Sequence, residues 1–66
     1  MGRTSIELRD QHGRPITRGA RVRSGGEEGV VRHIEPDYGV LTIVIEERPG
    51  SKVERMVRAA TVEVIA

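Results

Sequence analysis

The sequence predicts an all-β fold, a small barrel of five or six antiparallel strands with a one-turn 3-10 segment before the last strand. Its apolar runs are short and bounded by Gly, Pro, Asp and Ser, as in strands joined by tight turns. A helical period is absent, and 8 glycines interrupt the chain. Closing such a sheet into a barrel would remove its exposed edges.

Size and composition favour a single domain over residues 1–66, with residues 1–4 as a flexible N-terminus. A chain this short buries only about 60% of its unfolded surface. Phe and Trp are absent, so the core must be built from aliphatic side chains and Met. Small cores of this kind usually need a staple or a partner, and we expect a homo-oligomer. The lack of Cys, of a signal peptide and of any membrane-spanning segment favours the cytoplasm.

The first residues predict a short strand, a tight turn and a second extended segment. Ile6 and Leu8 alternate with charged residues, as in a half-buried strand. Residues 10–13 read Asp-Gln-His-Gly, the composition of a type I turn in which Asp bonds back to the chain. Residues 14–16 continue extended, and Pro15 is barred from a central position in a sheet.

Residues 19–34 predict two strands around a glycine-rich turn. Val22 points inward between two outward arginines, and residues 30–34 form the next strand with less cleanly separated faces. Between them, residues 25–29 read Gly-Gly-Glu-Glu-Gly, which we interpret as a hairpin turn. A phosphate-binding loop would need Gly-Lys-Ser/Thr and a following helix, and neither is present.

Residues 40–45 form the strongest predicted strand. Thr42 is their only polar member, so both faces of the strand are apolar. A strand of this kind is buried on both sides or makes a subunit contact. We therefore predict an oligomer interface on this strand, with residues 53–57 beside it. The predicted interface residues are Val40, Leu41, Ile43 and Ile45.

Turn signals delimit the remaining elements. Residues 36–39 contain Pro-Asp and a glycine suited to a left-handed conformation. Pro49 and Gly50 are the pair that a type II turn favours at its centre. Residues 53–57 form the returning strand, and residues 58–61 are long enough for one 3-10 turn. Residues 62–64 complete the sheet.

The charged residues suggest one binding surface. The chain carries 11 basic and 10 acidic residues, and Lys52 is the only lysine. Arg21 and Arg23 share the outer face of one strand, and Arg32 lies on the strand expected to pair with it. This arginine face could bind nucleic acid or an acidic protein, or its charges could simply be solvated and paired with glutamates. Tyr38 is the only aromatic residue, which disfavours base stacking.

No residue pattern predicts a metal, a cofactor or a catalytic group. His12 and His33 lack the spacing of metal ligands. Ser24, His33 and Asp37 are of the types found in a triad, but they are scattered over two strands and a turn. The sequence therefore predicts a non-enzymatic binding module without cofactor, metal or membrane partner.

Two glycine and valine patterns resemble the KOW type of SH3-like barrel. Residues 19–23 read Gly-Ala-Arg-Val-Arg, and residues 29–34 read Gly-Val-Val-Arg-His-Ile. The resemblance extends over residues 6–65 and implies the fold; some KOW modules also bind RNA. Those modules tend to carry a lysine-rich turn where this chain has Glu27 and Glu28, and adjacent carboxylates repel phosphate.

The layout is also similar to the plasmid-type (type II) dihydrofolate reductases, which are SH3-like barrels assembled as tetramers around a central pore. The segments GARVR, RPGS and AATVEVI carry this similarity. It implies an alternative function, an oligomeric pore-type enzyme. That family lines its pore with Val-Gln-Ile-Tyr, where this chain has Val-Glu-Arg-Met at residues 53–56. Ser24 stands where the family has a substrate-binding lysine.

Overall fold

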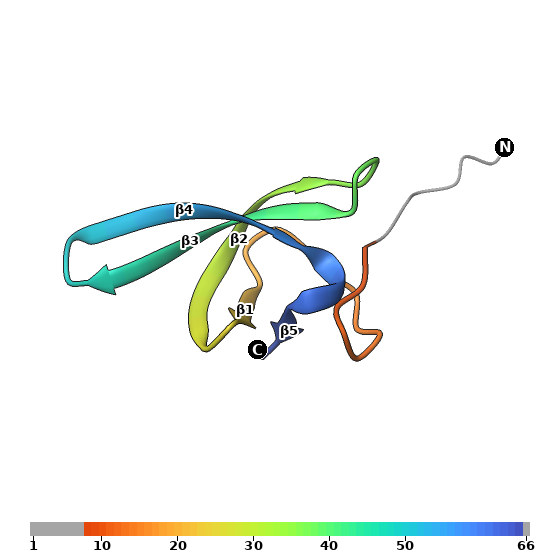
Figure 1. The fold of residues 1–66 in the computed structure, drawn as a ribbon, viewed down its shortest axis with the longest axis horizontal. Coiled ribbons are helices and arrows are strands. Elements are labelled where there is room, and N and C mark those ends of the chain that lie inside the picture. Colours follow the sequence, from red (N-terminus) through yellow and green to blue (C-terminus); the bar gives the residue numbers. More distant parts are fainter. Residues whose placement is uncertain (1–7, 66) are drawn as a thin grey trace, which may run out of the picture.

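The computed structural model describes residues 8–65 and contains one antiparallel five-stranded sheet in the order β4-β3-β2-β1-β5 (Figure 1). A single 3-10 turn, η1, precedes the last strand. The elements are β1 (Arg21–Ser24), β2 (Glu27–Glu35), β3 (Val40–Arg48), β4 (Ser51–Arg58), η1 (Ala59–Thr61) and β5 (Glu63–Val64). The predicted all-β class, the antiparallel strands and the 3-10 segment are confirmed.

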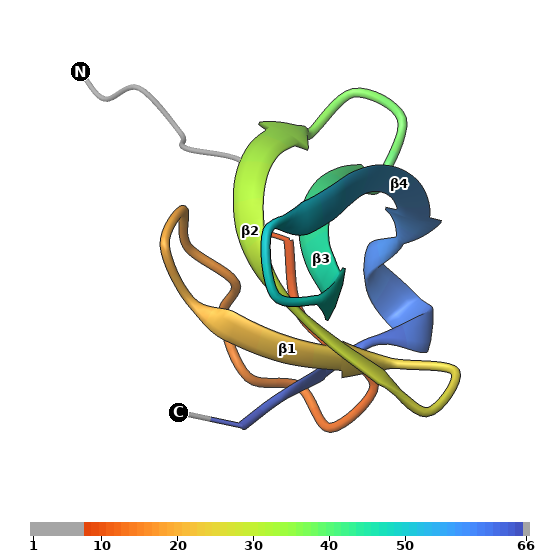
Figure 2. The same ribbon diagram turned by 90° about the vertical axis from the view of Figure 1, so that its left-hand side faces the viewer.

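The sheet curls without closing, in contrast to the barrel expected from the sequence. Figure 2 shows the curl, with β1 running across the direction of β3. Within residues 8–65, β4 and β5 are the two edges of the sheet and do not pair with each other. β5 consists of Glu63 and Val64, which pair with β1. A strand this short offers too little backbone to complete a barrel.

The β1–β2 hairpin turns on fewer residues than the sequence suggests. Gly25 and Gly26 form the whole turn, with φ of 57° and 86°. Positive φ at both central residues is the requirement of a type I′ turn, and glycine meets it without strain. The rest of the predicted turn, residues 27–29, already belongs to β2 and pairs with β1. The prediction that residues 25–29 form the turn is therefore wrong for its last three members.

The core lies on the concave face of the curled sheet, where apolar side chains alternate with outward ones. Val22 of β1 and Leu41 and Ile43 of β3 are completely inaccessible to solvent. Segments outside the sheet cover one end of this layer. The buried apolar residues are Ile16, Val22, Val31, Leu41, Ile43, Ile45, Ala59 and Val62. Burying one side chain of this kind stabilises the fold by about 1.5–3 kcal/mol.

Most of the predicted oligomer interface on β3 lies in the core of the chain itself. Leu41, Ile43 and Ile45 are buried, and Val40 is half-buried. The other face of the strand presents half-buried Thr42 and Val44. An interface on this strand would therefore have to use its outer face, because the core already covers the inner one.

β3 and β4 form a long hairpin that extends well beyond residues 40–45 and 53–57. Pro49 and Gly50 make its turn, and Gly50 has a φ of 81°, as the second central residue of a type II turn requires. The pairs continue to Arg48 and Ser51 beside the turn. The charged ends of both strands are therefore part of the sheet, although the register shifts by one residue between Glu46 and Arg48 of β3.

The segment before β1 packs against the sheet without forming a long strand. The predicted turn at residues 10–13 is confirmed, since the Gly13 N–H donates to the Asp10 carbonyl at 3.0 Å. Leu8 is half-buried against the core. The expected contribution of Ile6 and the expected flexible residues 1–4 lie outside the described residues. No helix in residues 8–65 is long and apolar enough to cross a membrane.

Candidate binding surface

The arginine face predicted from the sequence lies on the outer, convex side of the sheet. Arg21 and Arg23 are exposed on either side of buried Val22. Arg32 lies at an irregularity of β2, where the register with β3 shifts between Val31 and His33. The extra residue leaves both Arg32 and His33 exposed, whereas Val31 remains buried. This bulge explains why the two faces of residues 30–34 are hard to separate in the sequence.

Each of the three arginines contacts a carboxylate of its own chain. Glu28 on β2 lies 3.8 Å from Arg21 and 3.2 Å from Arg23. Arg23 also approaches Glu63 of β5 at 3.7 Å, and Arg32 pairs with Glu54 of β4. These side chains are one-third or more exposed, so each pair stabilises the fold by about 0–1 kcal/mol. The face is thus a mixed-charge surface rather than a basic one.

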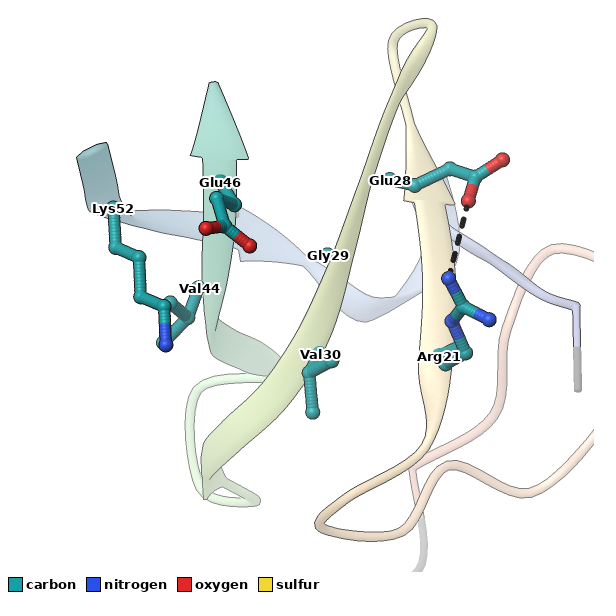
Figure 3. Close-up of a pocket in the computed structure, with 7 residues that line it drawn as sticks. All are labelled: Arg21, Glu28, Gly29, Val30, Val44, Glu46 and Lys52. Carbon is teal, nitrogen blue, oxygen red and sulfur yellow. Dashed lines mark ion pairs between the residues drawn. The ribbon is translucent and has the colours of Figure 1, made fainter. Parts of the chain in front are cut away.

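A shallow groove of about 380 Å³ crosses this face over four strands (Figure 3). The cross-strand neighbours Val30 and Val44 form its apolar floor. The ion pair of Arg21 with Glu28 lies on one side of the floor, and Glu46 and Lys52 lie on the other. Each side of the pair of valines therefore carries one cation and one carboxylate. The remaining lining residue is Gly29.

Gly29 brings β2 and β3 into close contact beneath the groove. A Cβ atom at this position would lie 2.8 Å from the Val44 carbonyl oxygen and 3.1 Å from a side-chain carbon of Ile45. Only glycine allows this approach of two backbones. Gly29 is buried within β2, whereas the sequence predicts that it belongs to the turn.

A second charged cluster lies at the open end of the concave face. Arg55 of β4 lies 3.6 Å from both Glu27 of β2 and Glu47 of β3. The open hollow beside it is lined by Glu27, Glu28, Ile45, Glu46 and Glu47. Among residues 8–65, no group of three or more His, Cys, Asp or Glu is placed to hold a metal ion. The cluster joins three strands at the end where the sheet is least covered.

The two histidines lie apart on the surface. His12 approaches Glu63 at 3.6 Å, and His33 contacts Glu35. Ser24 ends β1 beside the hairpin turn, whereas His33 lies near the far end of β2. The structure therefore does not bring Ser24 and His33 together.

Asp10 is the buried carboxylate of the described chain, with 5% of its surface exposed. Its Oδ1 accepts hydrogen bonds from the backbone N–H groups of His12 (2.9 Å) and Arg14 (2.8 Å), and its Oδ2 accepts one from Val64 (2.8 Å). Burial acts to raise the pKa of Asp10, but these three hydrogen bonds and the nearby charge of His12 together lower it below its ordinary value. Because both carboxylate oxygens accept hydrogen bonds from the backbone of the same chain, we interpret Asp10 as a structural clamp.

The segment that corresponds to the reductase pore stretch lies on edge strand β4. Val53 is half-buried against the core, Glu54 pairs with Arg32, and Met56 is 71% exposed on the outer face. The outer part of the stretch is therefore a charged and aliphatic surface in the single chain.

Comparisons with known proteins identify no similar protein. No protein-family model matches the sequence. Searches among curated proteins and among solved structures likewise find no match. The small all-β fold stands on the structure alone, and the KOW-like and reductase-like assignments stay predictions.

Proposed function

We propose that this chain is a non-enzymatic binding module whose arginine face and groove bind an extended segment of another protein. The observation that carries the proposal is the Val30–Val44 floor between two sets of opposite charges. An apolar floor with polar walls suits a polypeptide that places small apolar side chains inward and charged ones along its edges.

The distribution of charge favours a protein segment over a nucleic acid. A phosphate backbone would meet Glu28, Glu46 and Glu54 as soon as it approached the arginines. A peptide with both signs of charge can instead exchange partners with these glutamates and arginines, since exposed ion pairs are weak. Such complementarity sets specificity and the rate of association more than affinity.

Three outward arginines nevertheless keep nucleic acid as the second candidate. Arg21, Arg23 and Arg32 lie on adjacent strands of one face, and guanidinium groups bind phosphate well. Binding through phosphates would show a steep loss of affinity as salt is raised.

The test compares two kinds of ligand on the same protein. A phage-displayed random peptide library is selected against the wild-type chain, and enriched peptides are then measured against Val44→Asp and Arg21→Ala variants. We expect the enriched peptides to be of mixed charge. Their dissociation constant should rise at least tenfold in Val44→Asp, which corresponds to about 1.4 kcal/mol of binding free energy. An exposed Thr61→Ala variant at the other end of the molecule serves as the control and should bind normally.

Titration with oligonucleotides tests the second candidate, nucleic-acid binding. Single-stranded and duplex DNA and RNA are titrated at about 50 mM and 200 mM salt, the range over which phosphate contacts lose most affinity. Binding that falls steeply with salt and disappears on replacing Arg21, Arg23 and Arg32, without any enrichment of peptides, would overturn the proposal in favour of nucleic acid.

A further inference from the structure

Edge strand β4 presents a long unpaired backbone. It pairs with β3 from Ser51 to Arg58 and, among residues 8–65, has no neighbour on its other side. The opposite edge, β5, consists of Glu63 and Val64 alone. An unpaired edge offers N–H and C=O groups to any strand that can lie beside it. β4 is therefore the edge of this sheet that can form a further ladder.

The outer face of β4 carries an exposed apolar side chain at this edge. Met56 is 71% exposed and lies beside Thr42 of β3. Its neighbours on the same face, by strand alternation, are Glu54 and Arg58. Charged side chains on an edge strand discourage association unless they meet charges of opposite sign on the partner. This edge presents one carboxylate and one guanidinium on either side of a methionine.

Self-pairing across a two-fold axis limits the registers to a few. One residue of β4 then lies opposite its own copy, and its neighbours pair crosswise. A pair centred on Glu54 would oppose two carboxylates. A pair centred on Arg55 would oppose two guanidinium groups and also place Lys52 opposite Arg58. Like charges directly opposite each other destabilise a sheet, so both registers are disfavoured.

A pair centred on Met56 places no like charges opposite each other, and on its inner face it sets Arg55 against Val57. It places Met56 against its own copy and Glu54 opposite Arg58, twice by symmetry, and its ladder over residues 54–58 falls wholly within β4. A pair centred on Val53 would also be complementary, with Lys52 opposite Glu54. That register, however, would leave Met56 beside the partner's turn at Pro49 and Gly50, so its apolar surface would gain little cover.

We infer that β4 pairs with β4 of a second copy of this chain, antiparallel and centred on Met56, so that the two sheets form one continuous sheet. The pairing covers the exposed methionine, completes the backbone hydrogen bonds of the edge and matches its charges. It leaves the groove floor of Val30 and Val44 on a neighbouring part of the outer face, so it does not depend on the proposed function.

Single-cysteine variants test the register directly, because the chain has no native Cys. Opposed residues in an antiparallel pair have Cα atoms about 4.5–5.5 Å apart, within the range that a disulfide spans. Under mild oxidation we expect Met56→Cys to form a covalent dimer rapidly and Thr42→Cys, on the same face one strand away, to stay monomeric. Rapid cross-linking of Val53→Cys without that of Met56→Cys would overturn the inference.

A charge exchange tests the contact without cysteines. Sedimentation equilibrium over a wide concentration series measures the dissociation constant of the dimer. We expect Glu54→Arg or Arg58→Glu alone to raise this constant by about tenfold or more, and the double exchange to restore it, because two complementary pairs become repulsive and then complementary again. Arg58→Glu leaves the Arg32–Glu54 ion pair intact, so its effect reports on the edge. A monomer at every concentration, or a double variant no tighter than the single ones, would refute the pairing.

Discussion

The carboxylate of Asp10 accepts a 2.8 Å hydrogen bond from the backbone N–H of Val64. This contact joins the first turn of the described chain to its last strand, where β5 pairs with β1. The same carboxylate also caps the turn through His12 and Arg14. Asp10 therefore stabilises a junction that the short β5 strand alone holds weakly.

We predict that the Asp10 junction weakens in acid. The folded state lowers the pKa of Asp10, so the stability it contributes is present above the ordinary pKa of about 4 and is lost as pH falls through the lower folded value. Thermal denaturation from pH 7 to pH 2 should show a fall in Tm at the acid end. Asp10→Asn should lower Tm at pH 7 and flatten this part of the profile.

Asp37 provides the matched control for that experiment. It lies exposed in the turn between β2 and β3. Asp37→Asn should leave both Tm at pH 7 and the acid profile close to wild type. If Asp10→Asn showed the same dependence of Tm on acid pH as the wild type, Asp10 would not be the group that stabilises this junction.

We predict that Gly29→Ala destabilises the sheet. The added Cβ would lie 2.8 Å from the Val44 carbonyl oxygen, a backbone atom that can move only if β2 and β3 separate. Overpacking of this kind costs about 1–3 kcal/mol in the free energy of unfolding, measurable by urea denaturation. Val30→Ala, at the exposed neighbouring position, should cost less. Equal stability of Gly29→Ala and wild type would show that the two strands are not held this closely.

The two faces of β3 should respond differently to truncation. Leu41 is completely buried, so Leu41→Ala should lower the free energy of unfolding by about 2–5 kcal/mol, enough to unfold much of a chain this small. Val44→Ala on the half-buried outer face should cost clearly less. The comparison by circular dichroism and urea denaturation decides whether residues 40–45 act mainly as core, as the structure places them. A larger effect at Val44 would reverse that assignment.

The arginine face should contribute little to stability. Arg21→Ala removes one exposed ion pair and Glu28→Gln removes two, and we expect the free energy of unfolding to change by less than about 1 kcal/mol for each pair lost. Urea denaturation at low and high salt measures it. A substantially larger loss would mean that these side chains are part of the architecture, which would weaken their assignment to binding.

Much of the local structure could be predicted from the residues themselves. The turn at residues 10–13, the Pro49–Gly50 turn and the 3-10 segment each depend on side-chain chemistry within a few neighbours. The inward position of Val22 between two outward arginines follows from strand alternation alone. The bulge at Arg32 could not be predicted, because an extra residue in a strand is defined only by the strand that it faces.

The candidate site likewise combines features that the local sequence predicts with features that depend on neighbouring strands. The outward position of Arg21, Arg23 and Arg32 was predicted, but their partners Glu28 and Glu54 depend on which strands become neighbours. The groove requires Val30 and Val44 side by side, and that pair is a matter of register between β2 and β3. Gly29 was misassigned because its close contact with Val44 exists only across the ladder.

Local chemistry in the sequence was enough to predict an all-β fold, most of its tight turns and the alternation of most strand residues. Tertiary packing was needed to establish that the sheet stays open, that Leu41, Ile43 and Ile45 belong to the core, and that β4 is left as an edge. The physical reason is the range of the interactions. Turn chemistry and alternation act over a few residues, whereas closure, burial and cross-strand contact depend on the whole curled sheet at once.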